Sequence, residues 1–224
     1  MIQAVIFDLD GLLIDSEVIS YKIYKDLLAE YGYEFSIEDY GRNYSGKTSI
    51  GNMEALIRRF ELPIDTEEGL QKTEEIEKEY FKRGVDLKEG AVDLLKYLKN
   101  HQYKIALATS STKERALDVL RFYHIEDYFD EMVFGYEVKL GKPNPDIFLK
   151  ACEKVNELPE DCLVLEDSEA GIQAAYYAHI PVICVPDMKE PGKQFEEMTE
   201  CMVSSLLKVI SYMELDRTGK RILA

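Results

Sequence analysis

Hydrophobic and polar positions along the chain follow two patterns. Across residues 15–84, apolar side chains recur at helical spacing, and no stretch alternates as a strand does. From residue 85 onward, short apolar runs alternate with amphipathic stretches, which predicts strands alternating with helices. A further apolar run, Ala4–Phe7, predicts an opening strand of the same sheet. We therefore predict an α/β domain, residues 1–14 and 85–224, into which an all-helical domain, residues 15–84, is inserted.

Capping signals and apolar runs divide both parts into elements. In the inserted part, helices are expected over residues 16–31, from 36, over 48–60 and over 66–83. In the α/β part, strands are expected over 104–109, 131–134, 162–165, 181–185 and 201–203, and helices over 89–100, 111–124, 146–156, from 168 and over 204–215, before a loose tail, 216–224. Strands that alternate with helices imply a parallel sheet covered on both faces.

Composition narrows the class of protein. A chain of 224 residues with 46% hydrophobic residues can bury a sizeable core. Its net charge of −16 makes nucleic acid and anionic membranes poor partners. Its apolar runs are too short for a signal peptide or a membrane span. The four cysteines show no Cys-x-x-Cys spacing, which favours free thiols in the cytoplasm. We expect a monomer.

Two carboxylates follow the first predicted strand. Asp8 comes directly after Phe7, and Asp10 lies two residues further on, before Gly11. Side chains alternate along extended backbone, so Asp8 and Asp10 are expected to point the same way. Two converging carboxylates repel each other unless a cation lies between them or one of them holds a proton. The pair therefore indicates a functional site.

Polar residues also follow other predicted strands of the sheet. In an open parallel sheet, ligands bind outside the carboxyl ends of the strands. Carboxylates without histidine or thiolate suit a hard cation such as Mg²⁺, whereas hydroxyls, backbone amides and a lysine suit phosphate oxygens. Together these residue types predict a phosphoryl-transfer site. Besides the first pair, the residues are Thr109 and Ser110, Glu166 and Asp167, and Lys142 in the loop before a helix.

These motifs resemble those of the haloacid dehalogenase superfamily, in the branch that contains β-phosphoglucomutase and many small phosphatases. The opening Asp-x-Asp-Gly-x₃-Asp-Ser motif, the threonine after the second strand, the loop lysine and the acidic pair in LEDSEAGIQAA occur in family order. The resemblance covers the whole chain. It implies a Rossmann-like core with a helical cap domain inserted after the first motif.

The resemblance also implies a role for each residue. Asp8 would attack phosphorus to form an aspartyl phosphate, and Asp10 would act as general acid and then as general base. Mg²⁺ would bind the carboxylates of Asp8 and Asp167 and the backbone carbonyl of Asp10, with Glu166 either ligating or orienting. The residues expected to hold the transferring oxygens are Thr109, Ser110 and Lys142.

A second motif, residues 41–48, matches the P-loop pattern literally. A P-loop must leave a strand and enter a helix, whereas residues 36–40 predict a helical turn, so we do not expect a P-loop NTPase. In the resembled family this segment is a cap loop that faces the substrate. Gly46, Lys47 and Thr48 are therefore candidates for substrate contact, although Thr48 alternatively only starts a helix. A phosphonate hydrolase, which would use a cap lysine to form a Schiff base, remains a further alternative because of Lys47.

Phosphatase and mutase differ in the cap. β-Phosphoglucomutases carry a histidine and an arginine where Ser20 and Ser49 stand here. Loss of basic residues that would grip a second phosphate favours a Mg²⁺-dependent phosphatase acting on a small phosphomonoester, such as a sugar phosphate. The mutase remains the alternative. A phosphate-binding protein without activity is less favoured, because Asp8, Asp10 and Lys142 are all present.

Overall fold

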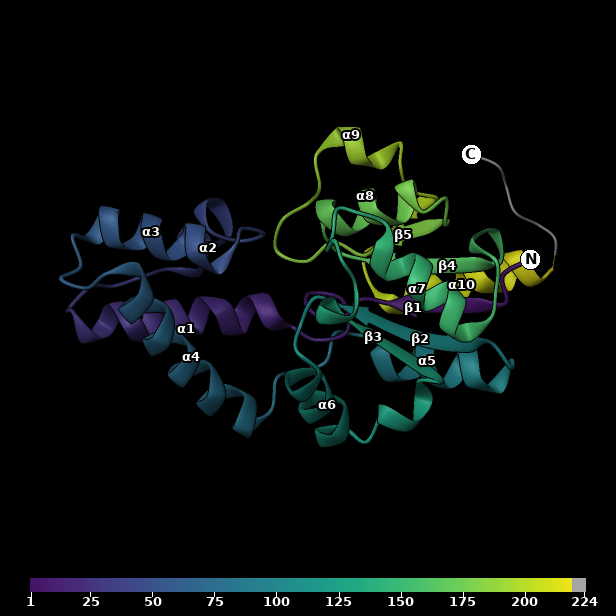
Figure 1. The fold of residues 1–224 in the computed structure, drawn as a ribbon, viewed down its shortest axis with the longest axis horizontal. Helices are drawn as coiled ribbons and strands as arrows, with labels where there is room; N and C mark the ends of the chain where they lie inside the picture. The colour runs from purple at the N-terminus through teal and green to yellow at the C-terminus, as the bar shows by residue number, and fades with distance from the viewer. Residues whose placement is uncertain (219–224) are drawn as a thin grey trace. The chain divides into compact units, whose positions relative to one another are not determined.

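A computed structural model describes residues 1–218. The chain divides into two compact units (Figure 1). One, here called the core unit, comprises Met1–Ile14 and the chain from Leu87 onward, and the other, the helical unit, comprises Asp15–Asp86. The chain thus leaves the core unit after its first strand and returns to it once.

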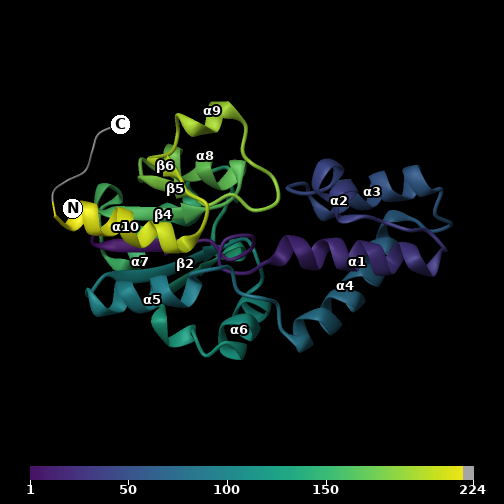
Figure 2. The ribbon, with the colours of Figure 1, turned by 180° about the vertical axis from the view of Figure 1, so that it is seen from behind.

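The core unit is built on one sheet. Its strands are β1 (Ala4–Phe7), β2 (Lys104–Thr109), β3 (Glu131–Phe134), β4 (Cys162–Glu166), β5 (Val182–Cys184) and β6 (Cys201–Met202). All paired strands are parallel, and within the described residues they lie in the order β3-β2-β1-β4-β5-β6. Figure 2 shows β5 and β6 side by side at one edge. The predicted α/β class with a parallel sheet is confirmed.

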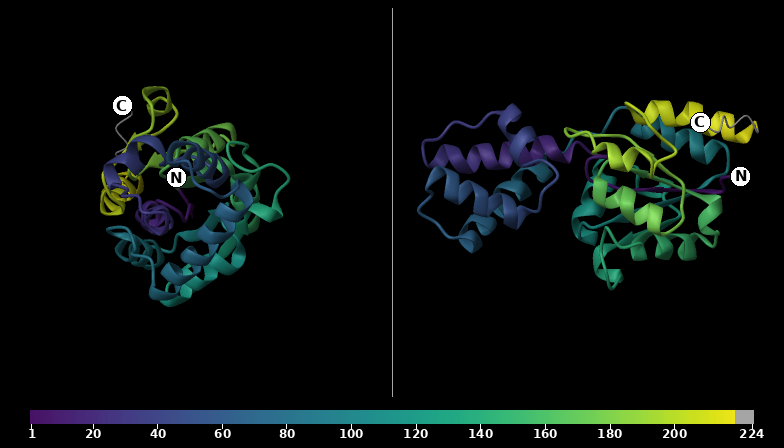
Figure 3. Two further views of the ribbon diagram at one scale, coloured as in Figure 1. Left: turned by 90° about the vertical axis from the view of Figure 1, so that its left-hand side faces the viewer. Right: turned by 90° about the horizontal axis from the view of Figure 1, so that it is seen from above.

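Helices cover both faces of this sheet. They are α5 (Ala91–Asn100), α6 (Lys113–Phe122), α7 (Asp146–Val155), α8 (Glu169–Tyr177), α9 (Lys193–Glu196) and α10 (Leu206–Arg217), with short 3₁₀ turns at Glu126–Tyr128, Gly135–Glu137 and Pro159–Asp161. The right-hand view of Figure 3 shows α5 and α10 on one side of the strands and α7 and α8 on the other. Because both faces are covered, β1, β2 and β4 are almost wholly apolar.

The helical unit consists of α1 (Ser16–Glu30), α2 (Ile37–Asn43), α3 (Ser49–Phe60) and α4 (Thr66–Arg83). Both α1 and α3 pack against α4. Side-chain caps define three helix starts: Ser36 accepts a hydrogen bond from the Asp39 amide, Thr48 from Gly51 and Asp65 from Glu68. The predicted signals at Ser36 and Thr48 therefore located α2 and α3, whereas the cap at Asp65 was not predicted.

Some element ends differ from the predictions. The capping signal that we assign to Ser16 lies one residue late, because Asp15 is the cap position of α1 and Ser16 is its first residue. The short helix α9 was not predicted. The tail prediction is wrong for Asp216 and Arg217, because α10 continues through Arg217 and the buried Asp216 carboxylate accepts a hydrogen bond from the Ile2 amide at 3.1 Å. The remainder of the predicted tail, residues 219–224, lies outside the described residues.

Two further observations concern membrane-spanning helices and the cysteines. Within residues 1–218, no helix combines the length and the apolar character that crossing a membrane requires. The cysteines at positions 152, 162, 184 and 201 are free thiols, as predicted, although the sulfur atoms of Cys152 and Cys162 lie 3.4 Å apart.

Candidate active site

Strand pairing brings several predicted site residues to one edge of the sheet. Phe7 of β1 pairs with Leu107 of β2 and with Leu165 of β4. Asp8 directly follows the end of β1, and Glu166 is the last residue of β4, so the two residues lie at the same level of the sheet. Adjacent parallel strands end side by side, which explains why residues far apart in sequence converge here.

Lys142 lies at the centre of this cluster. Its ammonium nitrogen donates hydrogen bonds to Asp8 Oδ1 and to Glu166 Oε1, the latter at 2.5 Å. The Lys142 side chain is only 8% exposed, and its nitrogen lies 4.9 Å from the ring centroid of Phe148 in α7. Burial opposes the charge, but the carboxylates of Asp8 and Glu166 outweigh it and raise the pKa of Lys142. The lysine therefore stays protonated between two carboxylates.

One lysine does not neutralise the acids around it. Burial raises the pKa of Asp8 to about 7, and the carboxylates of Glu166 and Asp10 add to this effect while Lys142 opposes it. Burial, Glu166 and Asp8 likewise raise the pKa of Asp167 well above its usual value. Carboxylate oxygens of Asp8, Glu166 and Asp167 all lie within 4.8 Å of one another. This excess of negative charge and all-oxygen donor set fit a hard divalent cation.

Glu166 is held by protein donors at both of its oxygens. While Oε1 contacts Lys142, Oε2 accepts hydrogen bonds from the Asp167 amide at 2.9 Å and from the Ser168 amide and hydroxyl, each at 3.0 Å. A Cβ atom at Gly171 would lie 1.8 Å from Glu166 Oε1, so only glycine leaves room for this carboxylate. The arrangement fits Glu166 as a residue that orients the cluster.

Gly11 makes a second close approach possible. Its backbone has φ +81°, in the left-handed region, and a Cβ atom there would lie 2.2 Å from Asp167 Oδ2. The glycine of the opening motif therefore lets the loop after β1 approach the Asp167 carboxylate.

Asp10 has partners that the sequence reasoning missed. Arg115 Nη1 lies 2.7 Å from Asp10 Oδ1, and the Ser111 hydroxyl donates to Asp10 Oδ2 at 2.5 Å. The helix was predicted to begin at Ser111, but α6 begins at Lys113, and Thr112 caps it by accepting a hydrogen bond from the Arg115 amide at 3.3 Å. Ser111 and Arg115 are one helical turn apart, a spacing that places two side chains on the same side of a helix. This spacing was the sequence signal from which their joint contact with Asp10 could have been predicted.

Thr109 and Ser110 follow at the end of β2. Thr109 is 1% exposed, and its Oγ1 accepts a hydrogen bond from the Ser111 amide at 3.0 Å. Because that oxygen acts as an acceptor here, its own hydrogen remains available for donation. Ser110, by contrast, is exposed.

The remaining predicted residues lie in the helical unit. Gly46 and Lys47 belong to the turn between α2 and α3, where Lys47 donates to the Asn43 carbonyl at 2.6 Å. Thr48 caps α3, so its hydroxyl oxygen has a structural partner at 3.2 Å. The segment before this turn is helix α2, as the rejection of a P-loop required.

Known proteins resemble this chain over most of its length. The haloacid dehalogenase-like hydrolase family matches residues 5–185. A "Phosphorylated carbohydrates phosphatase" of Thermotoga maritima is 36% identical over 178 residues, 80% of this chain and 82% of the relative. A "Probable pseudouridine-5'-phosphatase" of Drosophila melanogaster is 32% identical, over 89% of this chain and 88% of the relative. A solved structure from Thermotoga maritima, described as a "putative beta-phosphoglucomutase", has 32% identity and a TM-score of 0.83, with 95% of this chain and 99% of the other covered.

The chain belongs to the haloacid dehalogenase-like hydrolases. Within that superfamily it falls in the branch of phosphatases and β-phosphoglucomutase-like proteins, as the sequence motifs predicted. It is a phosphoric monoester hydrolase that acts on small phosphorylated substrates.

The excess of negative charge in the cluster of Asp8, Glu166 and Asp167 predicts that the protein becomes less stable as pH rises. Asp8 binds a proton more tightly in the folded protein than in the unfolded chain, because its pKa is raised from 3.8 to about 7. Between these two pKa values, the folded protein holds more protons than the unfolded chain. In EDTA, the free energy of unfolding should therefore fall by roughly 1 kcal/mol per pH unit as pH rises from 5 to 7.

Urea denaturation at pH 5, 6 and 7, with EDTA or with Mg²⁺, measures this slope. Mg²⁺ should flatten it, because a bound cation favours the ionised carboxylates. The Asp8→Asn variant should show a smaller slope in EDTA than the wild type. Stability that rises across this interval in EDTA would contradict the proposed charge excess.

Proposed function

We propose that this phosphatase hydrolyses a small phosphomonoester, such as a sugar phosphate, through an aspartyl phosphate on Asp8. The observation that carries the proposal is the convergence of Asp8, Glu166 and Asp167 around the buried Lys142, with Asp10 two residues beyond Asp8. A nucleophilic carboxylate, a second carboxylate for proton transfer and a buried cationic donor are the groups that transfer of a phosphoryl group to Asp8 and then to water requires.

In the first step, a carboxylate oxygen of Asp8 attacks phosphorus. The new oxygen–phosphorus bond forms as the ester bond to the leaving group breaks, and Asp10 gives its proton to the leaving oxygen. Lys142 donates to the transferring oxygens, together with the hydroxyl of Thr109 and the amide of Ser110, and so offsets their charge.

The second step releases phosphate. Asp10, now a carboxylate, accepts a proton from a water molecule whose oxygen attacks phosphorus. The bond to Asp8 breaks, which restores the Asp8 carboxylate and frees inorganic phosphate. Arg115 and Ser111, which both donate hydrogen bonds to Asp10 Oδ2 in the structure, are suited to orient this residue between the two steps.

Magnesium is the cation that the donor set favours. The carboxylates of Asp8 and Asp167 and the backbone carbonyl of Asp10 would hold it, with Glu166 orienting the cluster through Lys142 and the amides of Asp167 and Ser168. Bound Mg²⁺ offsets the negative charge of the carboxylates and of the phosphate. The all-oxygen ligands and the raised pKa values of Asp8 and Asp167 support this assignment.

We assign the helical unit the role of a cap domain, residues 15–84 by the sequence prediction. A cap that closes over the site would exclude bulk water while the aspartyl phosphate exists. Gly46, Lys47 and Thr48 of its α2–α3 turn are candidates for substrate contact. The related phosphatases of phosphorylated carbohydrates and of pseudouridine 5'-phosphate support a small hydroxyl-bearing metabolite, and the free thiols are consistent with the cytoplasm.

A panel of phosphomonoesters tests the proposal and separates phosphatase from mutase. The panel is incubated with Mg²⁺ or EDTA, and it includes β-glucose 1-phosphate with a trace of glucose 1,6-bisphosphate. Free phosphate and glucose 6-phosphate are both followed. We expect phosphate release to require Mg²⁺, because a bound cation has to offset the negative charge of the carboxylates and of the phosphate.

Two other results would change the conclusion. Formation of glucose 6-phosphate without release of phosphate would identify a mutase. Undiminished phosphate release in EDTA, after the protein has been stripped of metal, would contradict the proposed role of the cation.

A further inference from the structure

The carboxylate of Asp10 is held by a cation and a hydroxyl that also contact each other. The Ser111 hydroxyl donates to Asp10 Oδ2 at 2.5 Å, and Arg115 Nη1 donates to the same oxygen at 2.8 Å. The same nitrogen lies 2.7 Å from Asp10 Oδ1 and donates to the Ser111 hydroxyl oxygen at 2.5 Å. The three side chains therefore form a triangle in which each contacts the other two.

The backbone that presents Ser111 and Arg115 is fixed relative to the sheet. Both residues and Asp10 belong to the core unit, although they are 101 and 105 residues from Asp10 in sequence. Thr109 Oγ1, at the end of β2, accepts a hydrogen bond from the Ser111 amide at 3.0 Å. Thr112 caps α6, the helix that carries Arg115. The two donors to Asp10 are therefore placed by the strand end and by the helix start.

The side chain of Asp10 depends on these contacts for its orientation. The loop backbone beside it is held, because the Gly11 amide donates to the Ile14 carbonyl at 3.0 Å. The side-chain torsions are not fixed by that bond, and the χ2 torsion of aspartate has a broad distribution. The Asp10 side chain is 32% exposed, so packing on all sides does not hold it either. Ser111 and Arg115 are the described partners that select its orientation.

Lys142 and Arg115 contact different carboxylates. Lys142 donates to Asp8 and to Glu166, whereas Arg115 donates to Asp10. In the proposed mechanism, Asp8 attacks phosphorus and Asp10 transfers the protons. A change at Arg115 should therefore disturb the proton transfers and leave the nucleophile with its own cation.

We infer that Arg115 is a positioning residue, which holds the Asp10 carboxylate, directly and through the Ser111 hydroxyl, in the orientation that both proton transfers require. General acid–base catalysis contributes roughly 100- to 10,000-fold to a rate and needs the proton donor within hydrogen-bond reach of the reacting group. A carboxylate that turns away loses much of this contribution. The inference rests on the proposed function and adds to it a residue that acts through Asp10 and not on the substrate.

Arg115→Met tests the first proton transfer with two substrates. The alkyl oxygen that leaves a sugar phosphate needs a proton as it departs, whereas acetate leaves acetyl phosphate without one. We expect kcat/KM for the sugar phosphate that the wild type hydrolyses fastest to fall by at least about 30-fold. For acetyl phosphate, kcat/KM should change by at most about threefold, because this ratio includes only the steps up to the aspartyl phosphate.

The lifetime of the intermediate tests the second proton transfer. Protein labelled with radioactive acetyl phosphate is diluted into excess unlabelled acetyl phosphate, and the protein-bound label is followed in samples quenched with acid. In this step water loses a proton to Asp10, whichever substrate supplied the phosphoryl group. The label should therefore disappear at least about 10-fold more slowly from Arg115→Met than from the wild type.

Two further variants separate positioning from a general effect on the fold. Arg115→Lys keeps a cationic donor, and since one nitrogen of Arg115 makes all the contacts described above, an ammonium group can replace part of them. Its kcat/KM for the sugar phosphate should stay within about 10-fold of wild type. Arg121→Met removes an arginine of the same helix that pairs with Glu126 at 2.8 Å on the surface, and it should change neither measurement by more than about twofold. Thermal unfolding verifies that all three variants fold.

The possible failures of the inference and of the proposed function are distinguishable. Equal losses of kcat/KM for the sugar phosphate and for acetyl phosphate would mean that Arg115 acts on the phosphoryl group or on the fold, which overturns the inference while the proposed function stands. A label that disappears from Arg115→Met as fast as from the wild type would also overturn it. If the wild type forms no aspartyl phosphate from either substrate, the proposed function is wrong and the inference falls with it.

Discussion

Asp8→Asn is expected to lower kcat by at least about 10,000-fold, because an amide cannot form the aspartyl phosphate. Asparagine has nearly the shape of aspartate, and Lys142 retains Glu166 as a partner at 2.5 Å. The variant also removes one negative charge from a cluster in which burial and neighbouring carboxylates already raise the pKa of Asp8. In EDTA at pH 8 it should therefore be at least as stable as the wild type.

The measurement combines turnover with trapping of the intermediate. Wild-type protein quenched in acid during turnover should carry a phosphoryl group that is labile to base, and Asp8→Asn should carry none. Asp93→Asn changes an exposed aspartate of α5 and should keep activity within about twofold of wild type. If Asp8→Asn retains more than about one hundredth of the rate, Asp8 is not the nucleophile.

Lys142→Met is expected to produce the second large effect, on both stability and activity. The variant leaves Asp8 and Glu166 buried without their shared cation, which typically costs about 3–5 kcal/mol when a buried ion pair loses one partner. The loss should be greatest at pH 8 in EDTA and smaller at pH 5, where Asp8 holds a proton because burial raises its pKa to about 7. We also expect kcat/KM to fall by about 1,000-fold, because no buried cation donates to the transferring oxygens.

Urea denaturation at pH 5 and pH 8, with EDTA or Mg²⁺, tests this prediction. Mg²⁺ should restore part of the stability lost at pH 8, because it supplies positive charge to the same carboxylates. Lys99→Met is the control: Lys99 pairs with Asp130 at 2.6 Å on the surface, and its removal should cost at most about 1 kcal/mol at either pH. Equal losses at pH 5 and pH 8 for Lys142→Met would mean that the lysine acts through packing against Phe148 and not through its charge.

Local sequence patterns predicted most of the fold because helix and strand formation depends largely on residues close together in the chain. The bounds of β3 and α4 match the structure residue for residue, since the short apolar run of β3, the charged helical stretch of α4 and the glycine after it are all local signals. The predicted gathering of Asp8 and Glu166 follows from one rule of parallel sheets, that strand ends of the same kind share an edge. These features could be derived without any knowledge of how side chains pack.

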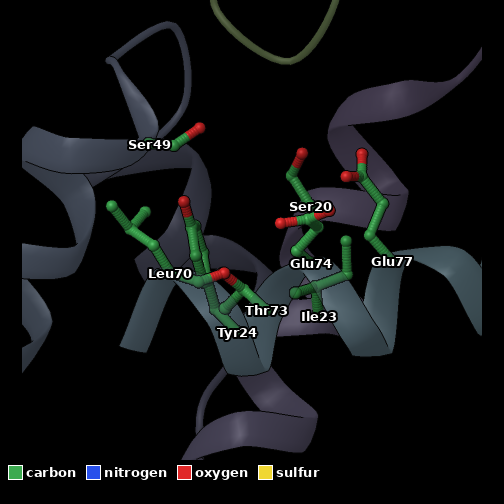
Figure 4. A pocket seen from close by; sticks show the side chains of 8 residues that line it. All are labelled: Ser20, Ile23, Tyr24, Ser49, Leu70, Thr73, Glu74 and Glu77. Atoms are coloured by element: carbon green, nitrogen blue, oxygen red, sulfur yellow. The ribbon is translucent and has the colours of Figure 1, made fainter. Parts of the chain in front are cut away.

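Side-chain partners across the chain depended on the tertiary structure. The pairing of Asp10 with Arg115, the hydrogen bond from Ile2 to Asp216, and the joining of Ser20, Ser49 and Glu77 around one pocket of the helical unit (Figure 4) all connect distant elements. The sequence by itself determined the order of the strands and of the longer helices, the family and the acids at the strand ends, since each can be recognised from short stretches of the chain. Which side chains meet, and the charge that results, depends on rotamers selected by packing, so only the tertiary structure decided the site's electrostatics and the lining of the pocket.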